Sequence, residues 1–200
     1  MSPKLTYKFS TPKGVFETWD QKPNIPLFHL AQTHSNFITH LDPTNHNNLS
    51  EGDGLIYSGN EAVNLAIVTA DCLPILVLGT KGIAMIHAGW QGLAAGIMEK
   101  PEIRSLCPQV FHIGPHIMAK AYQVGIEFKQ YFPKSKAFTL IDNKLYFDLE
   151  KEARNQIEKR FPFAETESSG ICTYNDQHFH SHRRDGTSLR NWNVFKFQKT

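Results

Sequence analysis

Three side chains with metal-binding or nucleophilic chemistry stand at the ends of apolar stretches of this chain. They are His34 in QTHSN, Cys72 in TADC and His87 in MIHAGW. Because the end of a strand is where a rigid scaffold presents side chains to a cleft, we expect all three to face one. Two imidazoles and one thiolate suit Zn²⁺, and three protein ligands with an open fourth position are typical of catalytic zinc. Zinc held this way activates a thiol or a water at neutral pH.

The spacing of these residues is not a short-range zinc motif, so two other interpretations stay open. In the first, Cys72 and the two histidines are unrelated, because buried histidines are most often satisfied core residues. In the second, no metal is bound and Cys72 is a nucleophile. His87 is then its base, and an acid such as Asp71 orients the base.

Two further segments carry groups that suit an anion. The turn with Gly89 and Gln91 leads into an expected helix, and backbone N–H groups at a helix start favour a phosphate. Arg183 and Arg184 are adjacent in the C-terminal segment, and paired arginines suit phosphate or carboxylate recognition. The alternatives are a turn that only needs its glycines and a solvated basic patch.

The remaining candidates are carboxylates and additional histidines. Asp53 and Asp71 are either carboxylates that orient a ligand histidine or simple turn residues. The chain has 10 histidines, and several lie in its second half: His112, His116, His178, His180 and His182.

Alternating and continuous apolar runs predict a strand-rich fold. Strands are expected at 4–10, 14–19, 24–31, 54–58, 63–69, 74–79, 82–87, 138–141, 145–147 and 191–197, and the stretch 110–116 is expected to be a strand followed by a turn. The turn at 79–82 makes a hairpin of two continuous apolar runs, whose two faces must both be covered. The polar stretches 42–54 and 171–190 are expected to be loops, and the second is expected to form part of a site.

Helices are expected at 91–100, at 124–132 and after Asp148. Pro101 should end the first helix. Asp148 should cap the third, in which Leu149, Ala153 and Ile157 recur on one face. The expected fold is α/β (α+β), a single layered domain spanning 1–200 with a mixed sheet flanked by helices.

Composition narrows the class of protein. A chain of 200 residues can bury a hydrophobic core without help from disulfide bonds or structural metals. A formal net charge of +2 does not indicate the strongly basic surface that binding to nucleic acid or to a membrane requires. No apolar run approaches the roughly 20 residues of a membrane span. Three cysteines and no signal-peptide pattern suit a reducing compartment, so a cytoplasmic protein is expected.

The stretches TADCLPILV and HAGWQGLAAGI together resemble the central signature of the YfiH-type, or laccase-domain, family. This family is also called the multicopper polyphenol oxidoreductase family and includes purine nucleoside phosphorylases. The segments QTHS, IGPHI, YQVG, FDL, CT and FHSHRRDG resemble its further blocks in the same order. The resemblance runs from about Phe28 to the C-terminus.

The resemblance implies a zinc site formed by His34, Cys72 and His87. It also implies phosphorolysis of adenosine, inosine, guanosine and methylthioadenosine, with adenosine deamination as a further activity. Copper and polyphenol oxidation are assigned to the family in other accounts, and one branch is linked to editing of peptidoglycan precursors. The family's fold resembles that of cysteine hydrolases, which keeps the metal-free interpretation open.

Three positions depart from the family pattern. Gln91 stands where an arginine is usual, Gln123 replaces a glutamate, and His182 stands where a tyrosine is usual. The ligand triad itself is intact. An arginine lost beside a phosphate site would weaken phosphorolysis in particular.

The sequence therefore predicts, first, a zinc-dependent purine nucleoside phosphorylase with possible adenosine deaminase activity. Its substrates would be a nucleoside and phosphate, and copper is the alternative metal. The other hypotheses are a metal-free cysteine hydrolase or precursor-editing enzyme that uses Cys72, a polyphenol oxidase, and a divergent member without enzyme activity. The oligomeric state stays open.

Overall fold

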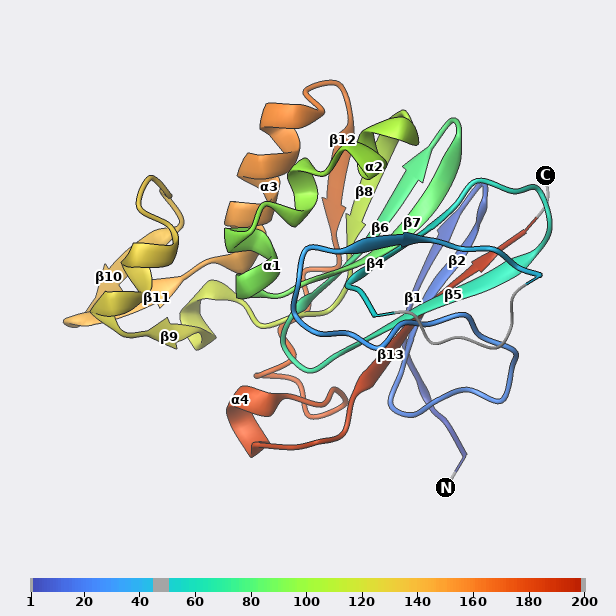
Figure 1. Cartoon of the computed structure of the whole chain (residues 1–200). Helices are drawn as coiled ribbons and strands as arrows, with labels where there is room; N and C mark the ends of the chain where they lie inside the picture. The colour runs from blue at the N-terminus through green and yellow to red at the C-terminus, as the bar shows by residue number, and fades with distance from the viewer. Residues whose placement is uncertain (1, 45–50, 199–200) are drawn as a thin grey trace.

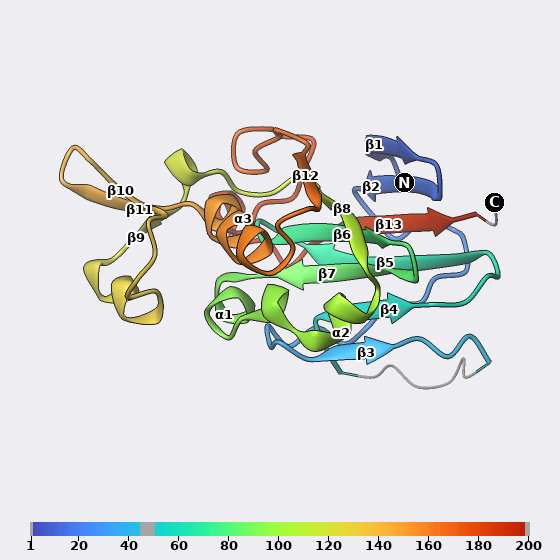
Figure 2. The ribbon, with the colours of Figure 1, turned by 90° about the horizontal axis from the view of Figure 1, so that it is seen from above.

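The computed structural model describes residues 2–44 and 51–198 (Figure 1). A central six-stranded sheet has the order β12-β8-β6-β7-β4-β3, and its pairs are both parallel and antiparallel. Helices cover one face of this sheet, and a four-stranded sheet packs on the other (Figure 2). The predicted α/β fold, a mixed sheet flanked by helices, is confirmed.

The second sheet is antiparallel, with the order β1-β2-β13-β5, and brings the two ends of the chain together. Its strands are β1 (Leu5–Thr11), β2 (Gly14–Trp19), β5 (Val63–Thr69) and β13 (Asn191–Phe197). The central sheet is built from β3 (Ile38–His40), β4 (Gly54–Tyr57), β6 (Leu73–Gly79), β7 (Gly82–Ala88), β8 (Pro108–Ile113) and β12 (Glu165–Ser168).

The β6–β7 hairpin forms the middle of the molecule, as its continuous apolar sequence predicts. Alternate residues of a strand point to opposite faces, so Ile75 and Ile86 meet the helices while Leu76 and Met85 meet the second sheet. By the same alternation His87 lies on the face of Met85, toward the second sheet.

The segment after β7 is a series of short helices rather than the predicted single helix at 91–100. These are α1 (Trp90–Ala94), the 3-10 helix η1 (Ile97–Glu99) and α2 (Pro101–Ser105). Gly96 adopts a left-handed φ of 72°, which ends α1. Pro101 begins α2, because proline at the first helical position loses no intrahelical hydrogen bond.

Helix α3 (Leu149–Arg160) matches its prediction. The Asp148 side chain accepts a hydrogen bond from the Lys151 N–H at 2.9 Å and caps the helix. Leu149, Ala153 and Ile157 are buried against the central sheet.

Residues 119–147 include an arm that projects from the layered body (Figure 1). Its elements are the 3-10 helices η2 (Ala119–Ala121) and η3 (Ile126–Tyr131) and the strands β9 (Gln123–Val124), β10 (Phe138–Ile141) and β11 (Lys144–Phe147). The helix predicted at 124–132 is thus a shorter 3-10 helix. It is held by the aromatic rings of Phe128, Phe132 and Phe147.

Two other predictions need correction. Residues 24–31 are not a strand, because Pro26 cannot donate to a ladder. Phe28 and Ala31 form isolated bridges to Leu65 and Glu51, and Leu30 packs into the hydrophobic core. The predicted loop 42–54 is described only in part, since 45–50 lie outside the described residues. The loop 171–190 contains one short helix, α4 (His182–Asp185). Among the described residues, no helix combines the length and apolar character that a membrane span requires.

Candidate metal centre

His87 is held in one orientation by a buried carboxylate. Its Nδ1 lies 2.7 Å from Oδ1 of Asp53, and the exposed fractions of the two side chains are 3 % and 0 %. The His87 N–H also donates to the Asp53 carbonyl at 2.7 Å. With Nδ1 occupied, Nε2 is the nitrogen available to a metal or a proton, which is the usual arrangement of a carboxylate behind a ligand histidine.

The same carboxylate builds the turn that carries His34. The backbone N–H groups of His34 and Ser35 donate to Asp53 at 3.0 and 2.6 Å, and the Ser35 hydroxyl donates at 2.7 Å. These bonds stabilise the left-handed φ of 58° at His34. Burial raises the pKa of Asp53, but hydrogen bonds from His87 and Ser35 lower it to about 2. Asp53 is therefore an anion that positions two of the three candidate ligands.

Cys72 is the last residue of the short connection from β5 and directly precedes β6. Burial raises the pKa of its thiol, but the charge of His87 and hydrogen bonds from His34 and His87 lower it more, so the net pKa of Cys72 falls well below its ordinary value. Burial in turn lowers the pKa of His87, while Cys72 and Asp53 raise it more. The site thus favours a Cys72 thiolate beside a His87 imidazolium, and the thiolate is the form that binds a metal.

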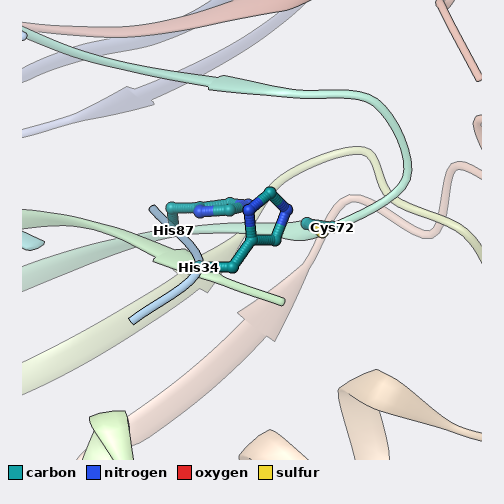
Figure 3. A group of neighbouring side chains, drawn as sticks. All are labelled: His34, Cys72 and His87. Atoms are coloured by element: carbon teal, nitrogen blue, oxygen red, sulfur yellow. The ribbon is translucent and has the colours of Figure 1, made fainter. Parts of the chain in front are cut away.

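The three side chains converge from separate elements (Figure 3). One ligand atom of each of His34, Cys72 and His87 lies within 4.8 Å of the others, and the two imidazole rings stand at 80° to each other. A tetrahedral zinc site places such atoms about 3.3–3.8 Å apart. His34 is exposed, so rotation of its side chain can close the remaining distance. The donor set and its geometry fit Zn²⁺.

Gly89, at the N-cap of α1, makes this convergence possible. A Cβ at position 89 would lie 3.1 Å from the Cys72 sulfur and 3.2 Å from the His34 ring. A side chain there would crowd two of the candidate ligands and force them to shift, so glycine favours their close approach. Helix α1 has only five residues, so it contributes less to anion binding than the sequence suggests.

The three residues lie in a pocket of about 510 Å³ between the ends of the two sheets. Its wall has an aromatic part, a basic part and an amide part. Trp90 and Tyr122 form the aromatic part. His182, Arg183 and Arg190 form the basic part, and Gln32 and Gln91 form the amide part. Asp71 and residues 68–70 complete the lining.

The two predicted arginines have different places. Arg183 lines the pocket, with its guanidinium 4.8 Å from the centre of the Tyr122 ring. Arg184 does not line it. Its guanidinium binds loop carbonyls, among them those of Thr173 at 2.7 Å and Phe179 at 2.8 Å.

The two predicted orienting carboxylates also differ. Asp53 contacts His87, as described above. Asp71 instead accepts hydrogen bonds from the Thr173 hydroxyl and the Arg183 N–H, both at 2.7 Å. Its carboxylate therefore organises the C-terminal loop rather than a ligand histidine.

Sequence reasoning did not single out Arg190, Tyr122 or Gln32 as pocket residues. Arg190 directly precedes the last strand, and the strand-end argument used for His34, Cys72 and His87 would have found it. Tyr122 and Gln32 gave no comparable signal. Of the additional histidines, His182 lines the pocket, whereas His112 lies in an aromatic stack and His116 lies beside Glu150.

Fold and site together define a layered α/β protein with a candidate His–Cys–His metal centre at the end of its central sheet. The sequence matches the family described as multi-copper polyphenol oxidoreductase laccase over residues 15–197, so the chain belongs to this family.

Curated relatives carry another description. The chain is 33% identical to "Purine nucleoside phosphorylase" of Haemophilus influenzae, over 88% of this chain and 76% of the relative. It is 31% identical to "Purine nucleoside phosphorylase YfiH" of Escherichia coli, over 84% and 72%.

Solved structures share the fold. A Neisseria meningitidis protein of the DUF152 family superposes with a TM-score of 0.76 at 28% identity, covering 87% of this chain and 76% of that one. YlmD of Geobacillus stearothermophilus gives a TM-score of 0.76 at 26% identity, covering 86% and 73%.

Proposed function

We propose that this protein is a zinc-dependent purine nucleoside phosphorylase. The bond between C1′ of the ribose and the purine would break, and C1′ would form a bond to a phosphate oxygen. The observation that carries the proposal is a triad of ligand atoms within 4.8 Å of one another, in a pocket that also holds aromatic rings and arginines. The names of the relatives support the same activity.

His34, Cys72 and His87 would hold the zinc. Bound there, zinc supplies a Lewis acid for an oxygen of the reactants. Asp53 would keep His87 oriented with its Nε2 toward the metal and would fix the turn of His34. The mixed nitrogen and sulfur donors favour zinc among common metals. Among the described residues one group of three ligands lies close enough to share an ion, which is too few for a multicopper oxidase.

Purine and phosphate would occupy different walls of the pocket. The Trp90 ring offers a face on which a planar base can stack, whereas the Tyr122 ring holds the Arg183 guanidinium 4.8 Å from its centre. Arg183 and Arg190 are the cations suited to phosphate, because a guanidinium offers paired donors to its oxygens. Gln91 is exposed at the rim and brings no charge, so the phosphate site relies on these two arginines.

The substrate range proposed is adenosine, inosine, guanosine and methylthioadenosine, which share the purine and the ribose. Deamination of adenosine is proposed as an additional activity of the same pocket.

We propose that residues 1–200 form one domain, because Val15 and Lys196, near the ends of the family match, pair in one sheet. A cytoplasmic location remains a prediction.

Product analysis after incubation with adenosine, with and without phosphate, tests the proposal. Adenine and ribose 1-phosphate formed only with phosphate are expected, and a zinc chelator should stop their formation. Inosine formed in both tubes would indicate deamination. No product despite one bound zinc per chain would overturn the proposal and favour a member without enzyme activity. Gln91→Arg should lower the KM for phosphate if the missing charge limits binding.

The thiolate–imidazolium character of Cys72 and His87 favours one alternative, a metal-free cysteine hydrolase or precursor-editing enzyme. The chelator separates the two functions. A metal-free hydrolase would keep its activity in chelator and lose it on alkylation by iodoacetamide. A zinc enzyme would lose activity in chelator, and bound zinc would protect Cys72 from alkylation.

A further inference from the structure

Asp71 directly precedes Cys72 and has an unusual backbone conformation. Its φ is 91°, in the region that favours glycine, and its side chain is only 7% exposed. Aspartate tolerates positive φ better than most residues. Such a conformation nevertheless persists only where the surrounding structure fixes it.

Three hydrogen bonds from distant parts of the chain fix Asp71. The Thr173 hydroxyl donates to Oδ1 and the Arg183 N–H donates to Oδ2, each at 2.7 Å. The Ile117 N–H donates to the Asp71 carbonyl oxygen at 2.9 Å. Asp71 therefore joins the strand connection that carries Cys72 to the segment after β8 and to the C-terminal loop.

Through this tether Asp71 determines where Arg183 lies. The backbone of Arg183 is bound to Asp71, while its guanidinium donates to the Gln123 carbonyl at 2.6 Å and covers the Tyr122 ring. Arg183 is thus fixed between the ligand-bearing strands and the arm. His182 and Arg190 belong to the same loop and line the same pocket.

We propose that Asp71 is a positioning residue that sets the arginine-bearing wall of the pocket relative to Cys72, and so controls the binding of phosphate. It acts through Arg183, and its role differs from that of Asp53, which orients a ligand. The effect on phosphate rests on the proposed function, whereas the effect on the loop does not.

Substitutions at Asp71 and Thr173 separate the effect of the hydrogen bonds to the Asp71 carboxylate from the effect of the positive φ at Asp71. Asp71→Gly keeps the positive φ accessible but removes the carboxylate, and Asp71→Asn keeps an acceptor oxygen. Thr173→Val removes one of the two hydrogen bonds to the Asp71 carboxylate, and Thr173→Ser, which keeps the hydroxyl, is its matched control. We expect Asp71→Gly to raise the KM for phosphate about tenfold with a smaller change in kcat. Asp71→Asn should restore part of this loss, and Thr173→Ser should resemble the wild type.

Hydrogen exchange and zinc content give readouts that need no activity. Asp71→Gly and Thr173→Val should exchange faster over 173–190, with unchanged protection of β6 and β7 and unchanged zinc. The proposal would be overturned if Asp71→Gly and Thr173→Val both kept the wild-type hydrogen exchange over 173–190 and the wild-type KM for phosphate. It would also be overturned if these variants lost zinc in parallel with phosphate binding. If the wild type cleaves no nucleoside, the proposed function fails, while exchange over 173–190 still decides whether Asp71 tethers the loop. If Asp71→Gly does not fold, Thr173→Val decides.

Discussion

Among the described residues, two buried histidines contact a carboxylate, and the contacts differ in which nitrogen is used. In His87, Nδ1 faces Asp53 at 2.7 Å, and Nε2 is left toward Cys72 and His34. In His116, Nδ1 donates to the Gly114 carbonyl at 2.8 Å, and Nε2 faces Glu150 at 3.3 Å. Both nitrogens of His116 are occupied, so of these two histidines it is His87 that has a nitrogen available for a ligand.

The carboxylates differ in a parallel way. Asp53 is fully buried and its other partners belong to the turn of His34, so it serves the site. Glu150 is partly exposed and binds Arg154 at 2.8 Å and Ser168 at 3.0 Å, so it ties α3 to neighbouring segments. We conclude that the first pair positions a candidate metal ligand and that the second is an ion pair of the scaffold.

The largest expected effect comes from exchanging the two histidines for asparagine. His87→Asn should reduce bound zinc from about one equivalent per chain to almost none, because a ligand is lost. His116→Asn should keep the zinc and lose stability instead. Elemental analysis and urea unfolding of both variants check this. Zinc retained in His87→Asn, or lost in a folded His116→Asn, would contradict the different roles assigned to the two histidines.

The carboxylates should show a smaller version of the same contrast. Asp53→Asn should weaken zinc binding about 10- to 100-fold, because the partner that orients a ligand histidine is altered. Glu150→Gln is the matched control and should leave zinc affinity unchanged. Competition with a chromophoric chelator measures both affinities. Equal affinities in the two variants would show that Asp53 has no special role behind His87.

These contrasts explain how much of the molecule could be predicted. The β6–β7 hairpin and α3 follow from local patterns, because continuous apolar runs and an Asp148 cap need no distant partner. The triad could be picked out because each member follows an apolar stretch. The split of 91–100 at Gly96 was missed, because whether a glycine ends a helix depends on packing.

The contacts behind the triad could be narrowed from the sequence but not decided. Asp53 and Asp71 are both candidates for orienting a ligand histidine or for a simple turn, and only the folded chain shows that Asp53 binds His87 and Asp71 binds Arg183. Adjacent Arg183 and Arg184 look equivalent, yet only the first lines the pocket. Such roles depend on partners about 20 to 110 residues away along the chain, which no local pattern records.

Acid should weaken the Glu150 pair in the zinc-free protein. Burial raises the pKa of Glu150, but contacts with His116, Arg154 and Ser168 lower it to about 2. A depressed carboxylate pKa stabilises the fold fully above the unfolded pKa of about 4.5 and loses this effect as the pH falls through 2. Glu150→Gln should therefore cost about 2–3 kcal/mol near pH 7 and about half as much or less near pH 3, where the effect is only partly lost. Urea unfolding at both values measures the difference, and a cost independent of pH would contradict the ion pair.

His112 is a third buried histidine. Unlike His87 and His116, it contacts no carboxylate among the described residues. Its ring stacks on Phe9 with centroids 3.8 Å apart, Nε2 lies 3.3 Å from the Tyr7 hydroxyl, and Nδ1 has no recorded partner within the described chain. Burial lowers its pKa to about 4.

Between pH 6.5 and 4 the unfolded chain binds a proton at His112 more readily than the folded one, so stability falls as the pH falls. His112→Phe removes this proton and keeps the stacking. It should stabilise the protein relative to the wild type by on the order of 1 kcal/mol more at pH 5 than at pH 8. Urea unfolding of both proteins at the two pH values checks this. Equal differences at both would mean that His112 titrates alike in the folded and unfolded chains, and that a buried histidine without a carboxylate costs this fold nothing in acid.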